Sequence, residues 1–294
     1  MKTKITYLAF TLLLMTAFLV GCAETEKKKE TEIEKTQEQE KLEIPIEYLA
    51  MGLKSNTQEH AKTVLKNEIP GIEVEHITLT GDAINHLTED GHKDIYLFVS
   101  GKGTVTANAE NYDIVPETIL LPNAIKTISI KATENDTLSF LKISTKLTEQ
   151  DLLDLKEFPA ENTQNVYYRK FTDCEAYTEP IKSPNTVSRT ILPNKYLPRI
   201  AMGTVQTKGP DKVGAHEHGM LEQLFLGLTD NQVIVYADDA QINFPEHSIL
   251  HIPLGSSHSV EALDGDEMYY VWMDFFRDKA GEEWLKTHNA VEEE

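Results

Sequence analysis

Three histidines and one glutamate stand at spacings that suit a metal ion. His216 and His218 are one residue apart, Glu222 follows shortly after them, and His258 lies further along the chain. Side chains two residues apart on a β-strand project from the same face, so His216 and His218 would form one wall of a site. Imidazole nitrogens with a carboxylate oxygen suit zinc, manganese, iron, nickel or copper. The sequence therefore predicts one divalent metal ion bound by His216, His218, Glu222 and His258.

Short strands are expected on both sides of these residues. In the first half they fall between residues 72 and 145, with turns at 101–103 and 108–111. A second β-rich run comprises 200–207, 212–218, 223–228, 232–237, 248–253 and 267–276. Many short strands separated by turn residues indicate an all-β sandwich or barrel.

A few short helices are expected beside the strands, near 58–67, 147–158 and 279–289. Thr148 is the expected N-cap of the second helix, because Glu149 and Asp151 follow in its first turn. Residues 160–198 contain four prolines among polar residues and are expected to form an extended connection between two domains.

The second half resembles a cupin. The first motif of that family has two histidines one residue apart and then a glutamate after three or four residues, and its second motif is Pro-x-Gly-x-x-His. The matching residues are His216, His218 and Glu222 for the first motif, and Pro253, Gly255 and His258 for the second. The resemblance extends to a two-domain bicupin, which implies two double-stranded β-helix barrels.

The first half fits the same template less well. Asp94 falls at the glutamate position, but the histidine positions fall near Thr88 and Asp90, and residues 122–127 contain no histidine. We therefore expect a degenerate first barrel that has lost the metal.

The N-terminus predicts export. Lys2 and Lys4 precede an apolar run over 8–19, and residues 19–22 (Leu-Val-Gly-Cys) resemble the bacterial lipobox. The resemblance implies cleavage before Cys22, acylation of Cys22 with palmitate-type chains, and a lipid anchor at the cell envelope, periplasmic or on the surface. A plain secretory signal or an N-terminal transmembrane anchor are the alternatives.

These features divide the chain into six parts. They are a lipoprotein signal peptide (1–21), a charged tether (22–43), a degenerate N-terminal cupin barrel (44–147), a helix and linker (148–198), a metal-binding C-terminal cupin barrel (199–276) and a C-terminal helix (277–294).

Composition excludes one class of partner. The chain has 28 basic and 48 acidic residues, a formal charge of -20, whereas nucleic-acid binding depends on clustered Lys and Arg. Its two cysteines are Cys22 and Cys174, so lipidation of the first would leave Cys174 without a disulfide partner.

The predicted metal site is compatible with three classes of function. The first is a Lewis-acid isomerase, dehydratase or lyase that acts on a small sugar acid or saccharide, with His251, Tyr236 or Tyr270 moving the proton. The second is an oxygen-dependent cupin, of dioxygenase or oxalate-degrading type, and the third is a non-catalytic sugar or metal binder. Gln223 would orient the carboxylate of Glu222 or a bound water. The oligomeric state, including a homodimer, stays open.

Overall fold

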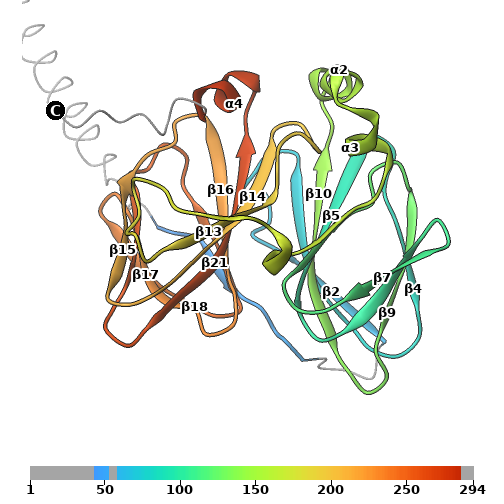
Figure 1. Cartoon of the computed structure of the whole chain (residues 1–294), viewed down its shortest axis with the longest axis horizontal. Coiled ribbons are helices and arrows are strands. Elements are labelled where there is room, and N and C mark those ends of the chain that lie inside the picture. The colour runs from blue at the N-terminus through green and yellow to red at the C-terminus, as the bar shows by residue number, and fades with distance from the viewer. Residues whose placement is uncertain (1–42, 53–57, 286–294) are drawn as a thin grey trace, which may run out of the picture. The chain divides into compact units, whose positions relative to one another are not determined.

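The computed structural model describes residues 43–52 and 58–285. These residues form two β-barrels, each built from a larger and a smaller antiparallel sheet, and a few short helices (Figure 1). The all-β fold with two barrels is thereby confirmed.

The first barrel consists of a six-stranded and a four-stranded sheet. The larger sheet has the order β11-β8-β5-β10-β3-β2 and the smaller one β4-β9-β6-β7. The strands are β2 (Glu59–Val64), β3 (Ile72–Leu79), β4 (Ile84–Leu87), β5 (His92–Ser100), β6 (Gly103–Ala107), β7 (Glu110–Ile114), β8 (Thr118–Leu121), β9 (Thr127–Ala132), β10 (Leu138–Lys146) and β11 (Tyr167–Lys170).

The second barrel consists of a seven-stranded and a four-stranded sheet. The larger sheet has the order β1-β19-β16-β21-β14-β13-β12 and the smaller one β15-β20-β17-β18. The strands are β1 (Ile46–Tyr48), β12 (Ala176–Tyr177), β13 (Val187–Leu192), β14 (Ile200–Lys208), β15 (Asp211–His216), β16 (Leu221–Gly227), β17 (Gln232–Ala237), β18 (Ala240–Pro245), β19 (Ser248–Ile252), β20 (His258–Ala262) and β21 (Glu267–Phe276).

Helices lie outside the barrels. They are α2 (Glu149–Glu157), α3 (Ala160–Gln164), the 3-10 turn η1 (Phe171–Asp173) and α4 (Lys279–Leu285). The N-cap prediction is confirmed for α2: the Thr148 side chain accepts a hydrogen bond from the Asp151 amide, and the Asp151 carboxylate accepts one from the Thr148 amide. This reciprocal pair is a capping box, which satisfies two backbone amides at the helix start.

The helix expected near 58–67 is wrong. Glu59–Val64 is instead strand β2, which pairs antiparallel with β3 along its full length. Its residues have no strong β-preference of their own, so pairing with the edge of the first sheet decides the structure.

Two segments join a barrel that their place in the chain does not suggest. Strand β1 comes before the first barrel yet pairs with β19 of the second. Within the expected linker, β11 pairs with β8 of the first barrel, whereas β13 pairs with β14 of the second. The 160–198 segment is therefore part of both larger sheets and not only a connection.

Three main apolar cores hold the two barrels. One fills the first barrel around Phe98 and Phe140, and another fills the second around Phe225 and Phe244. The largest contains residues from both larger sheets, such as Leu97 of β5 and Leu226 of β16. Strands of these sheets are consequently buried on both faces.

No helix in the part of the chain that the structure describes has the length and apolar character needed to span a membrane. Residues 1–42, with the predicted signal peptide, Cys22 and most of the tether, lie outside the described residues, as does the expected final helix beyond Leu285.

Candidate metal centre

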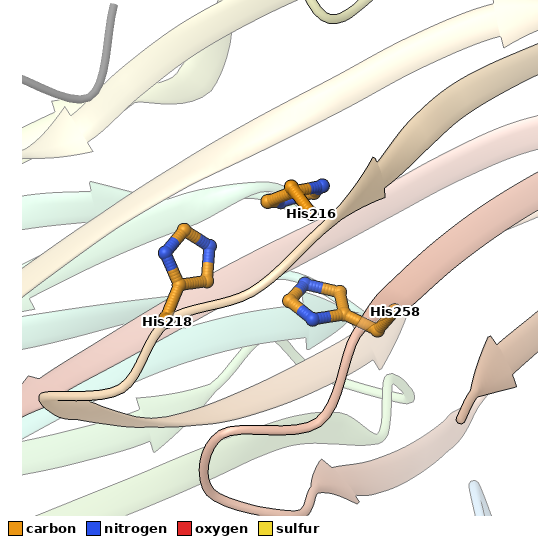
Figure 2. A group of neighbouring side chains, drawn as sticks. All are labelled: His216, His218 and His258. Atoms are coloured by element: carbon orange, nitrogen blue, oxygen red, sulfur yellow. The ribbon is translucent and has the colours of Figure 1, made fainter. Parts of the chain in front are cut away.

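The three predicted histidine ligands come together in the second barrel. His216 ends β15, His218 follows it, and His258 begins β20, where the register sets His258 opposite His216. One ligand nitrogen from each ring lies within 4.8 Å of the others. Figure 2 shows the three rings grouped around one space, with ring centroids 4.4 to 5.3 Å apart.

Backbone carbonyls orient two of these rings. Nδ1 of His216 lies 2.8 Å from the carbonyl oxygen of Gly214, and Nδ1 of His258 lies 3.2 Å from that of Ser256. A carbonyl can only accept, so each Nδ1 carries the proton and each Nε2 keeps its lone pair. With His218 buried beside them, the donor set suits a divalent transition-metal ion.

The imidazoles line a cavity of about 410 Å³. This volume is in the range of pockets that take small molecules. Apolar side chains form much of the wall, among them Phe225 and Trp272. Polar groups contribute the rest, including Lys182, whose Nζ donates to the Ser188 hydroxyl at 3.0 Å and pairs with Glu179.

Glu222, the fourth expected ligand, is not part of the group that the three histidines form among the described residues. One of its carboxylate oxygens lies 3.2 Å from Nε2 of His251, and the other accepts from Arg277 at 2.9 Å. Burial raises the pKa of Glu222, but the bonds to His251 and Arg277 outweigh it and leave the pKa below its usual value. Glu222 therefore belongs to an ionic chain outside the second barrel's interior.

The next residue, Gln223, faces the imidazoles instead. It lines the cavity with the three histidines, and its Nε2 donates to Oδ1 of Asp274 at 2.7 Å. Asp274 lies on β21 directly opposite Gln223 and is also a lining residue. Burial raises the pKa of Asp274 to about 7, against the lowering effect of the Gln223 amide.

Among the three predicted proton carriers, the structure brings only Tyr270 to the cavity. Its side chain is buried against Phe225, and burial raises the pKa of its phenol, as do the carboxylates of Glu179 and Asp274. Tyr270 is therefore a neutral hydrogen-bond donor at ordinary pH.

The other two predicted proton carriers do not line the cavity. His251 lies on β19 between Glu222 and Glu68, and it does not line the cavity. Tyr236 alternates with the core residues Val235 and Ala237, so it points outward, where its hydroxyl donates to Glu261 at 3.0 Å. Both residues lie on barrel strands, but on the outer faces.

In the first barrel, Asp94 lies at the position that corresponds to Gln223. Asp94 pairs with Ser144 of β10, as Gln223 pairs with Asp274 of β21. The carboxylate of Asp94 accepts from Thr88 at 2.7 Å, and the ammonium of Lys142 lies 3.9 Å away. His86 is buried nearby against Tyr96, while His92 is partly exposed.

Sequence reasoning missed Asp274 and Lys182 as residues of the site. Asp274 follows a run of large apolar residues on β21, and a carboxylate within such a buried run is a signal that could have been used. Lys182 belongs to the expected linker, and nothing in its neighbourhood indicates that it reaches a cavity.

No family model and no curated protein matches this chain. Solved structures do. A putative glyoxylate-induced protein from Pseudomonas aeruginosa is similar with a TM-score of 0.62 and 9% identity, over 75% of this chain and 82% of that one. A cupin 2 conserved barrel domain protein from Leptotrichia buccalis has a TM-score of 0.54 and 15% identity, over 77% and 92%.

Oxalate decarboxylase from Bacillus subtilis is similar with a TM-score of 0.57 and 13% identity, over 81% of this chain and 77% of that one. At these identities the likeness concerns the fold, and the cluster of three histidines comes from this chain itself. The chain therefore has the fold of the cupin-domain proteins, with two barrels and a histidine cluster in the second.

Proposed function

We propose that this chain is a metal-dependent cupin enzyme that acts on a small sugar acid or saccharide as an isomerase, dehydratase or lyase. The observation that supports it best is the grouping of His216, His218 and His258 at the wall of a cavity of small-molecule size. A divalent ion held there would act as a Lewis acid on a substrate oxygen.

The chain's own residues would do the rest. The phenol of Tyr270 donates a hydrogen bond to a substrate oxygen, and the apolar wall around Phe225 and Trp272 excludes water from it. Lys182, with 6% of its side chain exposed, contributes a positive charge suited to a substrate carboxylate.

The test begins with the metal content of the full chain made in its native host. A screen of sugar acids, including unsaturated uronates, follows with wild type beside His258→Ala. We expect about one metal ion per wild-type chain, loss of that ion in His258→Ala, and turnover only in the wild type. Wild-type protein without stoichiometric metal would refute the proposal.

An oxygen-dependent or oxalate-degrading activity is the second candidate, because oxalate decarboxylase shares the fold over 81% of this chain. Such chemistry needs a redox-active metal. Turnover by zinc-loaded protein without oxygen would exclude it, whereas strict dependence on oxygen and manganese, iron or copper would favour it.

We also propose that Cys22 carries a lipid that anchors the chain at the cell envelope. The lipobox-like residues 19–22 and the charged segment after them support this. Cys22→Ala is expected to move the protein from the membrane fraction to the soluble fraction of its host, and an unchanged distribution would refute the anchor.

A further inference from the structure

We infer that Gln223 supplies a fourth ligand, through Oε1, to the metal ion of the proposed centre, and that Asp274 sets the orientation of its amide. The inference rests on the proposed function, since it assumes an ion at the three imidazoles. It replaces Glu222, the ligand expected from the sequence, with the residue that follows it.

The first support is the direction of the side chains on β16. Phe225, two residues after Gln223, packs in the core inside the second barrel, whereas Leu224 and Leu226 pack in the core shared by the two larger sheets. Because alternate residues of a strand face opposite sides, Gln223 shares the inner face with Phe225. Glu222 shares the outer face with Leu224.

The second support is the set of residues that line cavities together with Gln223. Gln223 lines the 410 Å³ cavity with all three histidines, and it also lines a smaller cavity with His218 and His258. Glu222 lines neither of them. Gln223 is thus the side chain of β16 that places an oxygen able to bind a metal ion beside the histidine cluster.

The third support is an unsatisfied oxygen. Gln223 is 6% exposed, and among the described residues its Oε1 has no hydrogen-bond partner. A buried carbonyl without a partner is destabilising, and native proteins rarely leave one. A bound cation beside the imidazoles would satisfy this oxygen.

Asp274 explains why the oxygen, and not the nitrogen, is available. Its Oδ1 accepts a hydrogen bond from Nε2 of Gln223 at 2.7 Å, so the amide nitrogen is turned towards Asp274. The amide is thereby held with Oε1 away from Asp274. Asp274 is a positioning residue in this arrangement, because it acts on the ion through Gln223.

Glu222 cannot replace Gln223 as a ligand without a large rearrangement of β16. Both of its oxygens are engaged, by His251 and by Arg277, and its side chain lies on the outer face of β16. Bringing it inside would require a one-residue shift of the strand, which would turn every neighbouring side chain to the wrong face.

An amide ligand also changes the chemistry of the ion. Three imidazoles and an amide are all neutral, so the two positive charges of a divalent ion are not cancelled by its ligands. Such an ion binds less tightly than one with a glutamate ligand but polarises a substrate oxygen more strongly.

The test measures metal affinity in the full chain, by competition with a chelator for Zn²⁺ and by the visible absorption of bound Co²⁺. The two neighbours give a matched pair. Glu222→Gln should bind Zn²⁺ as wild type does, and Gln223→Ala should bind it on the order of 10-fold to 100-fold more weakly. Gln223→Glu should bind it more tightly and alter the Co²⁺ spectrum, because a carboxylate replaces an amide.

The outcomes separate the inference from the proposed function. A large loss in Glu222→Gln with wild-type binding in both Gln223 variants would overturn the inference while His258→Ala still showed the metal site. If His258→Ala also bound Zn²⁺ as wild type does, the proposed function itself would fail. Circular dichroism of each metal-free variant checks that it has folded. If Gln223→Ala does not fold, the Zn²⁺ affinity and Co²⁺ spectrum of Gln223→Glu test the inference instead.

The role of Asp274 is tested by a double mutant. Asp274→Asn can accept or donate, so it no longer fixes the Gln223 amide, and Zn²⁺ affinity should fall on the order of 10-fold. Asp274→Asn should lower the Zn²⁺ affinity much less in the Gln223→Glu background, because both terminal atoms of a carboxylate are oxygens. An equal loss in both backgrounds would show that Asp274 acts on the structure alone.

Discussion

Tyr270 is a side chain on which we expect turnover, but not metal binding, to depend. It is 2% exposed, lines the cavity, and remains a neutral phenol because burial raises its pKa. Tyr270→Phe removes only the hydroxyl. We expect kcat to fall by about 10²-fold or more while the metal content stays at the wild-type value.

The matched control is Tyr236→Phe, since Tyr236 points outward from its strand. Its turnover should equal that of the wild type. Equal turnover by Tyr270→Phe and the wild type would show that another group donates the proton.

We expect His86 to make the first barrel sensitive to acid. It is 8% exposed, and burial lowers its pKa from 6.5 to about 4, so the folded protein keeps it neutral where the unfolded chain protonates it. Its contribution to stability is complete above pH 6.5 and is lost as pH falls towards 4. At about 1.36 kcal/mol per pKa unit, the loss approaches roughly 3 kcal/mol.

His86→Phe should therefore retain more of its pH 8 stability at pH 5 than the wild type does, in urea unfolding followed by circular dichroism. Part of the acid sensitivity should remain, because burial also lowers the pKa of His76 to about 4. Identical pH profiles for variant and wild type would exclude His86 as a cause.

Residue patterns predicted the histidine cluster but not the choice between Glu222 and Gln223. The family spacing allows three or four residues before the ligand, so it admits both positions. Strand β16 is buried on both faces, so its apolar residues do not alternate with polar ones, and nothing local shows which residue faces inward. His251 was misplaced for the same reason, because β19 is buried throughout.

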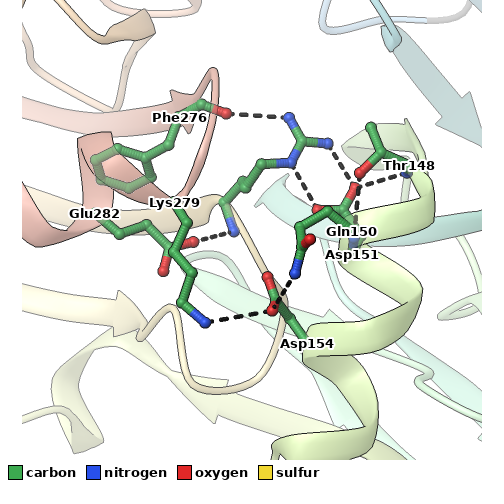
Figure 3. A network of polar contacts seen from close by, with 8 residues as sticks. Thr148, Gln150, Asp151, Asp154, Phe276, Lys279 and Glu282 are labelled. Atoms are coloured by element: carbon green, nitrogen blue, oxygen red, sulfur yellow. Dashed lines mark hydrogen bonds and ion pairs between the residues drawn. The ribbon is translucent and has the colours of Figure 1, made fainter.

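At the scale of elements, an ion pair fastens helix α2 to strand β14. The guanidinium of Arg199, the residue before β14, donates to both oxygens of Asp151 at 2.7 Å and to the Phe276 carbonyl at 3.0 Å (Figure 3). Lys279 of α4 adds a contact of 3.3 Å to Asp154. The capped end of α2 is therefore bound to the second barrel.

Arg199→Met should lower the free energy of unfolding by about 3 kcal/mol, because it leaves the carboxylate of Asp151 buried without its partner. Denaturant unfolding measures the change. Lys208→Met is the control: it breaks a pair with Glu267 whose lysine is 83% exposed, and its effect should stay within about 0.5 kcal/mol. Equal effects of the two substitutions would contradict the role of the Arg199 pair.

Local chemistry predicted α2 well, because Thr148 and Asp151 form a capping box that depends on only four successive residues. Strand β2 could not be predicted in this way. Its sequence, Glu-His-Ala-Lys-Thr-Val, suits a helix as well as a strand. The structure depends on pairing with β3, which lies further along the sequence.

At the scale of the whole molecule, His251 connects segments that belong to different barrels. Its Nδ1 lies 2.9 Å from Glu68, in the turn between β2 and β3, and its Nε2 lies 3.2 Å from Glu222 of β16. Each ring nitrogen of His251 therefore faces one carboxylate oxygen. This chain of charges adds to the apolar core that the two larger sheets share.

Glu68→Gln should lower the free energy of unfolding by about 1 to 2 kcal/mol, since it replaces a charged hydrogen bond with a neutral one. Glu73→Gln, at an exposed position of β3, is the control and should have no measurable effect. Equal stability of Glu68→Gln and the wild type would show that the shared apolar core joins the barrels without help from this contact.

The strands of both halves could be predicted as a sandwich or barrel, because they are rich in β-branched and aromatic residues with turn residues between them. The prediction of two barrels came from the resemblance to a bicupin. The exchange of short segments between barrels could not be predicted. Strand β1 has three residues and β11 has four, which is too few for a pattern, and each pairs with a strand far away in the sequence.

Strand β1 has a mechanical consequence. It is bonded only to β19 in the larger sheet, through the pairs Ile46 with Leu250, Glu47 with Ile249 and Tyr48 with Ser248. A pulling force applied to the chain before Ile46 would thus load β19 of the second barrel directly, and β2 of the first barrel through the ion pair of Glu47 with Lys62. Because β19 leads into the turn that ends at His258, a force on β1 would act next to the histidine cluster.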